Sequence, residues 1–165
     1  MCVFPDIATR REHKGEQFGF EYEVTVGPMG FRCGYIRVLP GHPWFGLQYD
    51  DIPVDVHGGL TYASNGVDCA THPGYAEWWI GFDCGHYCDA LDPSLRNHPA
   101  VGGGGMFKAN DLLKEKGHDR STFSEGEDLG FGQFTRVRTR DYVQAECESL
   151  CEQAKAAQER LMLNP

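Results

Sequence analysis

The chain has 165 residues, 41% of them hydrophobic, and a formal net charge of -9 at pH 7. This length fits one domain with a buried core, and the acidic balance argues against non-specific binding to nucleic acid or to an anionic membrane. The sequence has neither an apolar run of membrane-spanning length nor an N-terminal stretch typical of a signal peptide. We therefore expect a cytoplasmic protein whose seven cysteines are reduced thiols.

The N-terminal half predicts an antiparallel sheet. Residues 1–17 are charged without a period, and we expect an irregular arm there. From Phe18 to Gly27 the sequence alternates between large apolar and small or polar residues, which predicts a half-buried strand with its even-numbered residues inside. Further strands are predicted over residues 31–39, 54–63 and 75–84. The short links between them indicate an antiparallel meander.

Residues 93–134 show no strong periodicity and are interpreted as a long excursion. A short helix is predicted from about Phe107 to Lys116. The run Gly102–Gly105 is interpreted as a flexible hinge or loop. It is not a phosphate-binding loop, because it lacks the lysine and the Ser/Thr that such a loop requires.

Residues 141–163 predict an amphipathic helix, with Asp141 as its N-cap. Apolar residues recur at spacings of four and three along one stripe, namely Val143, Cys147, Leu150, Ala154, Ala157 and Leu161. Cys147 and its neighbour Cys151 are therefore predicted to pack in the core. The expected fold class is α+β, an antiparallel sheet of four or five strands with the C-terminal helix packed on one face.

Histidines and aspartates stand at the ends of two predicted strands. His57 precedes Gly58-Gly59 in one strand, while Asp83 ends the next and is followed by His86 and Asp89. Imidazole and carboxylate groups together suit a divalent metal or a general acid–base pair, so these histidines and aspartates are the candidate catalytic residues. In a purely structural alternative, His57 forms a hydrogen bond across the Gly58-Gly59 bulge and Asp83 caps the following loop.

A second set of residues has the ligand types of a zinc site, namely Cys69, His72, Cys84, His86 and Cys88. The spacing is unfavourable, because paired zinc knuckles separate their ligands by about two to four residues and Cys84 and His86 are separated by one. Free cysteines also behave as small buried hydrophobic residues. A divalent metal is the only cofactor that either set of residues indicates.

Other residues are candidates for ligand binding. Arg136, Arg138 and Arg140 alternate, so an extended segment would project all of them from one side to bind phosphate or an acidic partner. The alternative is a solvated strand face balanced by nearby acids. Trp79 is predicted on the strand face opposite the core and would be an exposed contact.

Parts of the sequence resemble a family of small uncharacterised proteins encoded by bacteriophages and prophages. The resemblance covers about Gly34 to Cys88 and the final helix, and its most specific part is the block VDVHGGLTYA…WWIGFDCGHYCD. The matching residues are His57, Gly58, Gly59, Trp78, Trp79, Gly81, Phe82, Asp83, His86 and Asp89. The resemblance implies a phage-type setting, with the host cytoplasm as location, and supplies no mechanism.

Two functions follow as hypotheses. The first is an accessory protein that binds a host protein or a small nucleotide-like ligand and counteracts host defence, with Trp79 and the arginines as contacts. The second is a small hydrolase, either metal-dependent or of the acid–base type, in which Asp83 and Asp89 bind the metal or orient a histidine. His57 or His86 would then be the general base.

Overall fold

The structure is a computed structural model that describes residues 7–65, 77–117 and 123–163. Its strands are β1 (Arg11–Gln17), β2 (Phe20–Val26), β3 (Arg32–Val38), β4 (Tyr62–Ser64), β5 (Trp78–Asp83), β6 (Asp89–Ala90), β7 (Asp128–Gly130), β8 (Gln133–Phe134) and β9 (Arg136–Val137). Its helices are α1 (Ile7–Arg10), α2 (Gly105–Glu115) and α3 (Arg140–Leu163), with short 3-10 turns η1 (Tyr49–Asp51), η2 (Pro93–Leu95) and η3 (Gly102–Gly104). No helix in these ranges is long and apolar enough to cross a membrane.

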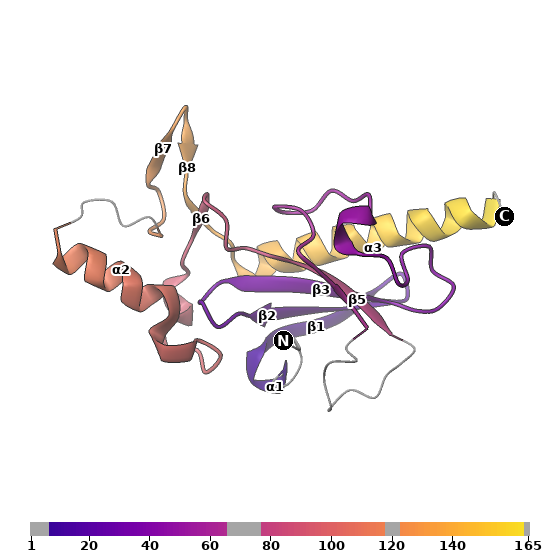
Figure 1. The fold of residues 1–165 in the computed structure, drawn as a ribbon, viewed down its shortest axis with the longest axis horizontal. Coiled ribbons are helices and arrows are strands. Elements are labelled where there is room, and N and C mark those ends of the chain that lie inside the picture. Colours follow the sequence, from indigo (N-terminus) through magenta and orange to yellow (C-terminus); the bar gives the residue numbers. More distant parts are fainter. Residues whose placement is uncertain (1–6, 66–76, 118–122, 164–165) are drawn as a thin grey trace.

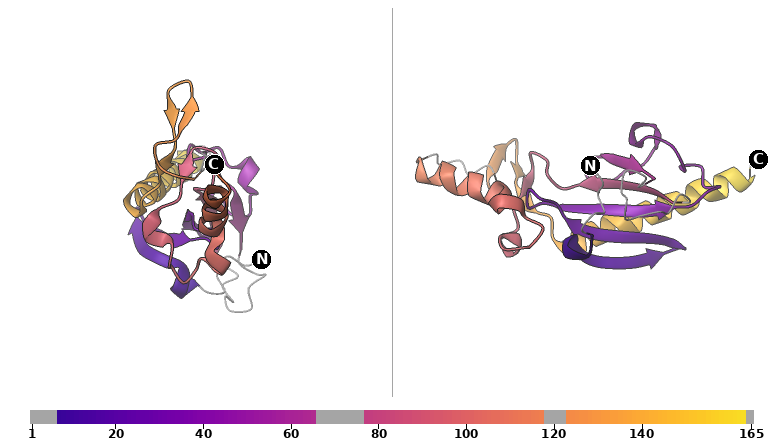
Figure 2. Two further views of the ribbon diagram at one scale, coloured as in Figure 1. Left: turned by 90° about the vertical axis from the view of Figure 1, so that its left-hand side faces the viewer. Right: turned by 60° about the horizontal axis from the view of Figure 1, so that its bottom comes forward.

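The main sheet has five antiparallel strands in the order β1-β2-β3-β5-β4 (Figure 1). Helix α3 runs along one face and packs against β1, β2 and β3 (Figure 2). The predicted α+β architecture is therefore confirmed. A shorter helix, α2, and the projecting β7–β8 hairpin lie together at one end of the molecule, away from the C-terminal end of α3 (Figure 1).

The core lies between the sheet and α3, as the alternation of apolar residues predicts. On β2 the side chains of Phe20, Tyr22 and Val24 are at most 8% exposed and belong to this core. The strand is more than half-buried, contrary to the prediction, because Glu23 and Thr25 are also at most 3% exposed. Gly34 on β3 allows the helix to approach closely, because a β-carbon there would overlap the Phe82 ring and the Cys147 sulfur. Cys147 and Cys151 are fully buried, so their predicted packing role is confirmed.

The long connection between β3 and β4 also packs on α3. The His42 ring hydrogen-bonds the Ala154 carbonyl at 2.9 Å. Further along, the Gln153 side-chain amide accepts from the Asp55 backbone N–H at 2.9 Å and donates to the Asp55 carbonyl at 2.8 Å. These contacts fix the path of a connection that has no regular strand of its own, and they place His57 on the α3 side of the sheet.

The prediction of an irregular arm over residues 1–17 is wrong for its second half, where β1 forms an edge strand. Residues 1–6 lie outside the described part of the chain. β1 is polar throughout, so it carries no apolar alternation that would predict a strand. Its support comes from pairing with β2 and from ion pairs such as Arg11 with the buried Glu23, at 2.8 Å.

The predicted strand over residues 54–63 is also wrong for most of its length. Only Tyr62–Ser64 is a strand, and it forms the edge of the sheet beside β5. The order of strands is therefore not a simple meander, because β5 inserts between β3 and β4. Residues around His57 instead form a turn in which Gly58 and Gly59 both have positive φ.

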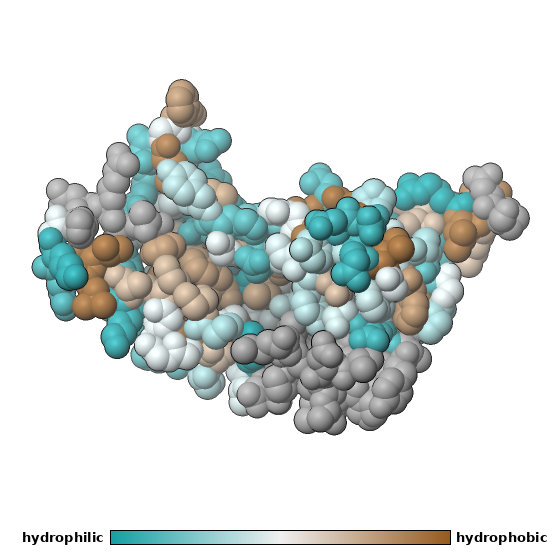
Figure 3. Space-filling view, in the orientation of Figure 1, coloured by the Kyte–Doolittle hydropathy of each residue, from teal (hydrophilic) through white to brown (hydrophobic). Residues whose placement is uncertain are grey.

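The excursion over residues 93–134 contains the predicted helix, α2, as well as the β7–β8 hairpin. The glycine run is a 3-10 turn followed by the first residue of α2, with positive φ at Gly103, Gly104 and Gly105. The hairpin projects from the rest of the molecule (Figure 3). Its turn between β7 and β8 contains Phe131, which is fully exposed.

Helix α3 begins at Arg140, and its first turn is capped by Thr139 and not by the predicted Asp141. The Thr139 hydroxyl accepts from the Tyr142 backbone N–H at 3.2 Å. The predicted apolar stripe is buried as far as Ala157, whereas Leu161 is 47% exposed because α3 extends past the sheet at that end (Figure 1).

Candidate functional site

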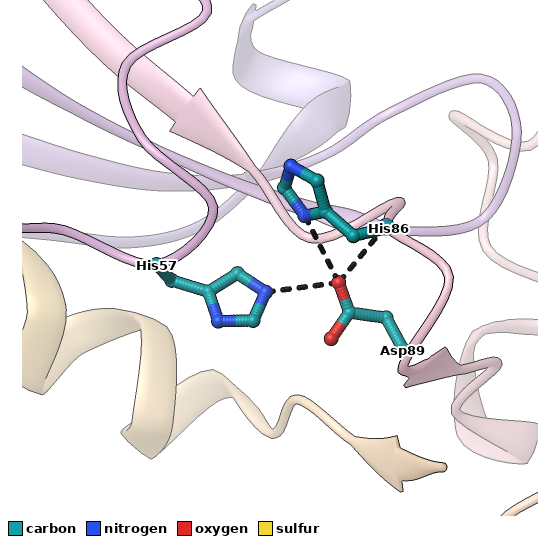
Figure 4. A group of neighbouring side chains, drawn as sticks. All are labelled: His57, His86 and Asp89. Carbon is teal, nitrogen blue, oxygen red and sulfur yellow. Dashed lines mark hydrogen bonds and ion pairs between the residues drawn. The ribbon is translucent and has the colours of Figure 1, made fainter. Parts of the chain in front are cut away.

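Three candidate catalytic side chains meet where the β5–β6 turn approaches the His57 turn (Figure 4). One carboxylate oxygen of Asp89, Oδ2, lies 2.9 Å from His57 Nε2 and 3.2 Å from His86 Nδ1. The same oxygen accepts the backbone N–H of His86 at 3.0 Å. The ring centroids of the two histidines are 5.2 Å apart. Asp89 is thus the centre of the cluster, with both imidazoles directed at it.

The Asp89 side chain is completely buried, and its other oxygen is neutralised by an arginine. Arg138 Nε donates to Oδ1 at 2.7 Å. The parallel pairing of β6 with β9, which sets Asp89 opposite Arg136, brings Arg138 to this position. Burial alone would raise the pKa of Asp89, but hydrogen bonds from His57, Arg138 and the His86 backbone outweigh it and hold this pKa well below its usual range. The carboxylate therefore stays ionised at neutral pH.

Helix α3 holds His57 from the side away from Asp89. The Tyr142 hydroxyl lies 3.1 Å from His57 Nδ1, and the Glu146 carboxylate accepts the His57 backbone N–H at 2.8 Å. Tyr142 in turn carries the Arg138 guanidinium over its ring, 4.9 Å from the centroid. Tyr142 and Glu146 on α3 therefore position His57, while Arg138, which precedes the helix, positions Asp89.

The glycine that follows His57 has a steric role at this site. Gly58 adopts φ 67°, a conformation that L side chains rarely take, and a β-carbon there would overlap the His86 ring. Gly59 also has positive φ, at 83°, yet a β-carbon there would meet nothing within 4 Å. The His-Gly-Gly sequence therefore combines a tight turn with the space that the second imidazole occupies.

The cluster has the donor set of a metal site. One ligand atom from each of His57, His86 and Asp89 lies within 4.8 Å of the others, and this is the only such group of three in the described ranges. Two imidazoles with one carboxylate suit a first-row divalent ion. The His57 side chain is 8% exposed and that of His86 is 31% exposed, so the cluster is open to solvent on the His86 side.

Asp83, which the sequence analysis grouped with these residues, lies elsewhere. Its Oδ1 accepts the Gly85 backbone N–H at 2.9 Å and its Oδ2 accepts the Thr61 hydroxyl at 3.0 Å. Asp83 therefore caps the turn after β5, as the structural alternative predicts. It is paired with Cys33 on the sheet face opposite α3, whereas His57 lies on the α3 side.

The predicted ligand-binding residues do not form one surface. Trp79 is 7% exposed, so the expectation of an exposed contact is wrong. The predicted comb of arginines is also wrong. Arg136 begins β9 and lies opposite Asp89 in the ladder, whereas the Arg138 side chain turns inward to Asp89. Arg140 begins α3 and pairs with Asp141 at 3.1 Å. The comb fails because the extended segment ends at Val137.

The alternative zinc set is only partly visible, because Cys69 and His72 lie outside the described residues. Cys84 is 1% exposed and packs in the core, where burial raises the pKa of its thiol well above the usual range. Cys88 contacts the Asp89 carboxylate through its sulfur at 3.9 Å. Neither cysteine belongs to the group of potential metal ligands found among the described residues.

Tyr142 and Glu146 were not among the predicted site residues, and Arg138 has a different role from the predicted one. Tyr142 and Glu146 lie one helical turn apart beside the apolar stripe of α3, and this spacing is the only sign of them in the sequence.

Comparison of the chain with models of protein families, with curated proteins and with solved structures finds no significant match. The chemistry of the site is therefore the basis for a functional proposal.

Proposed function

We propose that His57, His86 and Asp89 bind a divalent transition-metal ion and that the protein is a small metal-dependent hydrolase. The observation that carries the proposal is the convergence of two imidazole nitrogens on one oxygen of a buried, ionised carboxylate. Zinc bonds of about 2.1 Å at tetrahedral angles separate neighbouring ligand atoms by about 3.4 Å. The distances of 2.9 and 3.2 Å between the ligand atoms need only a small expansion to admit such an ion.

Three protein ligands are the number typical of a catalytic metal site, because the fourth position remains for water. The partners around the ligands fit this role. Tyr142 bonds the second nitrogen of His57 and Arg138 bonds the second oxygen of Asp89. Such outer partners fix the orientation of metal-binding imidazoles and carboxylates in known sites.

The reaction class follows from the chemistry of a bound water. A zinc ion held by His57, His86 and Asp89 would lower the pKa of a bound water to about 7 and would so supply a nucleophile for hydrolysis at neutral pH. In such a hydrolysis the acyl or phosphoryl group of the substrate would take the hydroxyl group of the water, and the leaving group would take its proton. Substrate would approach from the His86 side, where the cluster reaches solvent.

Metal titration of the purified protein tests the proposal. We expect one equivalent of Zn²⁺ or Mn²⁺ to bind at micromolar concentration, with loss of binding in His57→Ala, His86→Ala and Asp89→Asn. His98→Ala is the matched control, because His98 is partly exposed and its Nδ1 accepts the Ala100 backbone N–H outside the cluster. A folded parent that binds neither ion at millimolar concentration would contradict the proposal.

The β7–β8 hairpin favours a second candidate function, the binding of a host protein. Phe131 is fully exposed at its tip and adopts φ 54°, which costs a non-glycine residue about 1–3 kcal/mol. Phe134 on the same hairpin is 47% exposed. An exposed ring adds nothing to the core, whereas aromatic side chains are enriched among the residues that dominate protein–protein binding.

Affinity capture with the parent and with Phe131→Asn tests this second candidate. Asparagine tolerates the left-handed conformation, so the variant removes the ring and keeps the hairpin. We expect a host protein that the parent retains and the variant does not. Equal retention by both proteins would exclude the hairpin as the binding surface.

A further inference from the structure

A cavity in the described part of the chain has no lining residue in common with the His57–His86–Asp89 cluster. Its volume is about 420 Å³, within the range of small-molecule sites of about 300–1,000 Å³. It lies at the β2–β3 turn, and its lining includes Met29, Phe31, Cys33, Asp83, Met106 and Phe123. Strand alternation places it opposite α3: Gly34 and Phe82 face that helix, so their neighbours Cys33 and Asp83 face the cavity.

Most of this lining is apolar and adaptable. The Phe31 and Phe123 rings meet edge to face, with centroids 6.1 Å apart. Met29 and Met106 contribute flexible thioether side chains, and Met29 is 50% exposed. Aromatic rings beside methionines form a surface that can accept an aromatic or branched apolar group.

Asp83 is the charged group of the cavity. Its two hydrogen bonds come from uncharged donors, Gly85 N–H and the Thr61 hydroxyl, and no lysine, arginine or histidine of the described residues forms an ion pair with it. Each carboxylate oxygen can accept a further bond. The other ionisable lining residue, Cys33, is uncharged at neutral pH, because burial raises the pKa of its thiol to about 11. The cavity thus combines apolar walls with one negative charge.

We infer that this cavity binds an amphipathic organic cation, a protonated amine carried on an aromatic or branched apolar body. The ammonium group pairs with Asp83, and the apolar body lies among Phe31, Phe123 and the methionines, where the ring faces also attract a cation. The charge of Asp83 disfavours an anionic occupant such as a nucleotide phosphate. This site is separate from the proposed metal centre and needs no metal.

Three probes of one shape and different charge test the inference, with 2-phenylethylamine as the cation, 2-phenylethanol as the neutral analogue and 3-phenylpropionate as the anion. Binding is measured by NMR titration of the full chain at pH 7 and low salt. We expect the amine to bind about tenfold more tightly than the alcohol, the size of one charge-assisted contact at a partly open site, and the carboxylate to bind most weakly. Absence of amine binding at 10 mM, or equal affinity for amine and alcohol, overturns the inference.

Asp83→Asn keeps an oxygen that can accept the Gly85 N–H and removes the charge. We expect this variant to bind the amine and the alcohol equally. Asp128→Asn is the matched control, because the Asp128 carboxylate accepts the Gly130 N–H at 2.8 Å in the same local arrangement on the distant β7–β8 hairpin. Met106→Trp, which fills the cavity, should weaken all three probes. Tenfold preference for the amine that persists in Asp83→Asn, or unchanged binding in Met106→Trp, places the amine elsewhere and overturns the inference.

Discussion

Asp83 and Asp89 stand at the two ends of one turn, yet their surroundings are opposite in kind. Asp89 is fully buried, and Arg138 at 2.7 Å compensates its charge. Asp83 faces a cavity on the other side of the sheet, where its hydrogen bonds come from a backbone N–H and a hydroxyl. The segment between them passes from one face of the sheet to the other, so one short connection contributes to two separate sites.

Each of these environments suits a carboxylate to a different role. A buried carboxylate with several fixed donors positions other groups, because moving any of them breaks a charge-assisted hydrogen bond. A carboxylate whose hydrogen-bond donors are uncharged keeps its charge available for a ligand. The same residue type therefore serves as the centre of the proposed metal site in one case and as the charged group of a binding cavity in the other.

The largest expected effect is a difference in stability between variants of the two carboxylates. Asp89→Ala leaves the partly buried Arg138 without its counter-ion and removes the acceptor of both imidazoles, so we expect the unfolding free energy to fall by about 3–5 kcal/mol. Asp83→Ala removes a turn cap and should cost about 1 kcal/mol. Urea denaturation followed by circular dichroism measures both. Equal losses in the two variants would show that the contrast between the carboxylates does not extend to folding.

The second prediction concerns the space that Gly58 leaves for His86. Gly58→Ala and Gly59→Ala both place a side chain at positive φ, which costs about 1 kcal/mol in each case. Only Gly58→Ala also displaces the His86 ring. We expect Gly58→Ala to weaken Zn²⁺ binding about 100-fold and Gly59→Ala to leave it nearly unchanged. Competition with a chelating dye gives both affinities.

If the two glycine variants bind Zn²⁺ equally well, His86 is not a ligand and the cluster has the structural role of tying the turns together. If both lose binding equally, the conformation of the turn matters and the contact with His86 does not. The pair therefore separates the steric role of Gly58 from the shared backbone requirement.

The third prediction tests the layer of contacts around the cluster. Tyr142→Phe removes the hydroxyl at 3.1 Å from His57 Nδ1 but keeps the ring beneath Arg138. We expect Zn²⁺ affinity to fall about tenfold, the lower end of such outer-partner effects. Tyr87→Phe is the matched control, since Tyr87 lies in the same turn as His86 and is 73% exposed. An affinity change of the same size in both variants would argue against the role of Tyr142.

Local patterns predicted the elements that bury an apolar face. The alternation of Phe20, Tyr22 and Val24 and the stripe through Leu150 correspond to β2 and α3, because in both elements the same residues set the local conformation and the core packing. Edge strand β1 was missed, since its polar sequence gives no sign of pairing with β2. β1 and β2 are neighbours in the chain, but a strand that is polar on both faces shows no alternation.

The candidate site was also predicted only in part. The sequence marked His57, His86 and Asp89, but the assumption of a strand over residues 54–63 grouped Asp83 with them. In the structure the path of the His57 segment is set by Gln153 and Glu146 on α3, at large sequence separation. Such contacts depend on how the loop packs on the helix, so no spacing in the sequence could have revealed them.

The smallest effect is expected at His42, a buried imidazole that has backbone partners in place of a carboxylate. Its Nδ1 accepts the Trp44 N–H at 3.0 Å, so its Nε2 carries the hydrogen that the Ala154 carbonyl accepts at 2.9 Å. This arrangement holds the neutral form. Burial lowers the pKa of His42 below its usual value, and the bond to Ala154 only partly opposes the shift.

Because the unfolded chain takes up a proton on His42 near pH 6.5 and the folded chain resists it, the unfolding free energy should fall as pH decreases below about 6.5 and level off below the folded-state pKa. His42→Gln removes this titration. We therefore expect the unfolding free energy of the parent, taken relative to that of the variant, to decrease by less than about 1.4 kcal/mol per pH unit between pH 7.5 and pH 5. Urea denaturation at successive pH values measures it, and titration of every other group cancels in the difference. A difference that stays constant over this range would mean that the folded protein protonates His42 as readily as the unfolded chain does. His42 would then protonate like a solvent-exposed histidine. Burial and backbone hydrogen bonds would not be enough to keep its imidazole neutral in this fold.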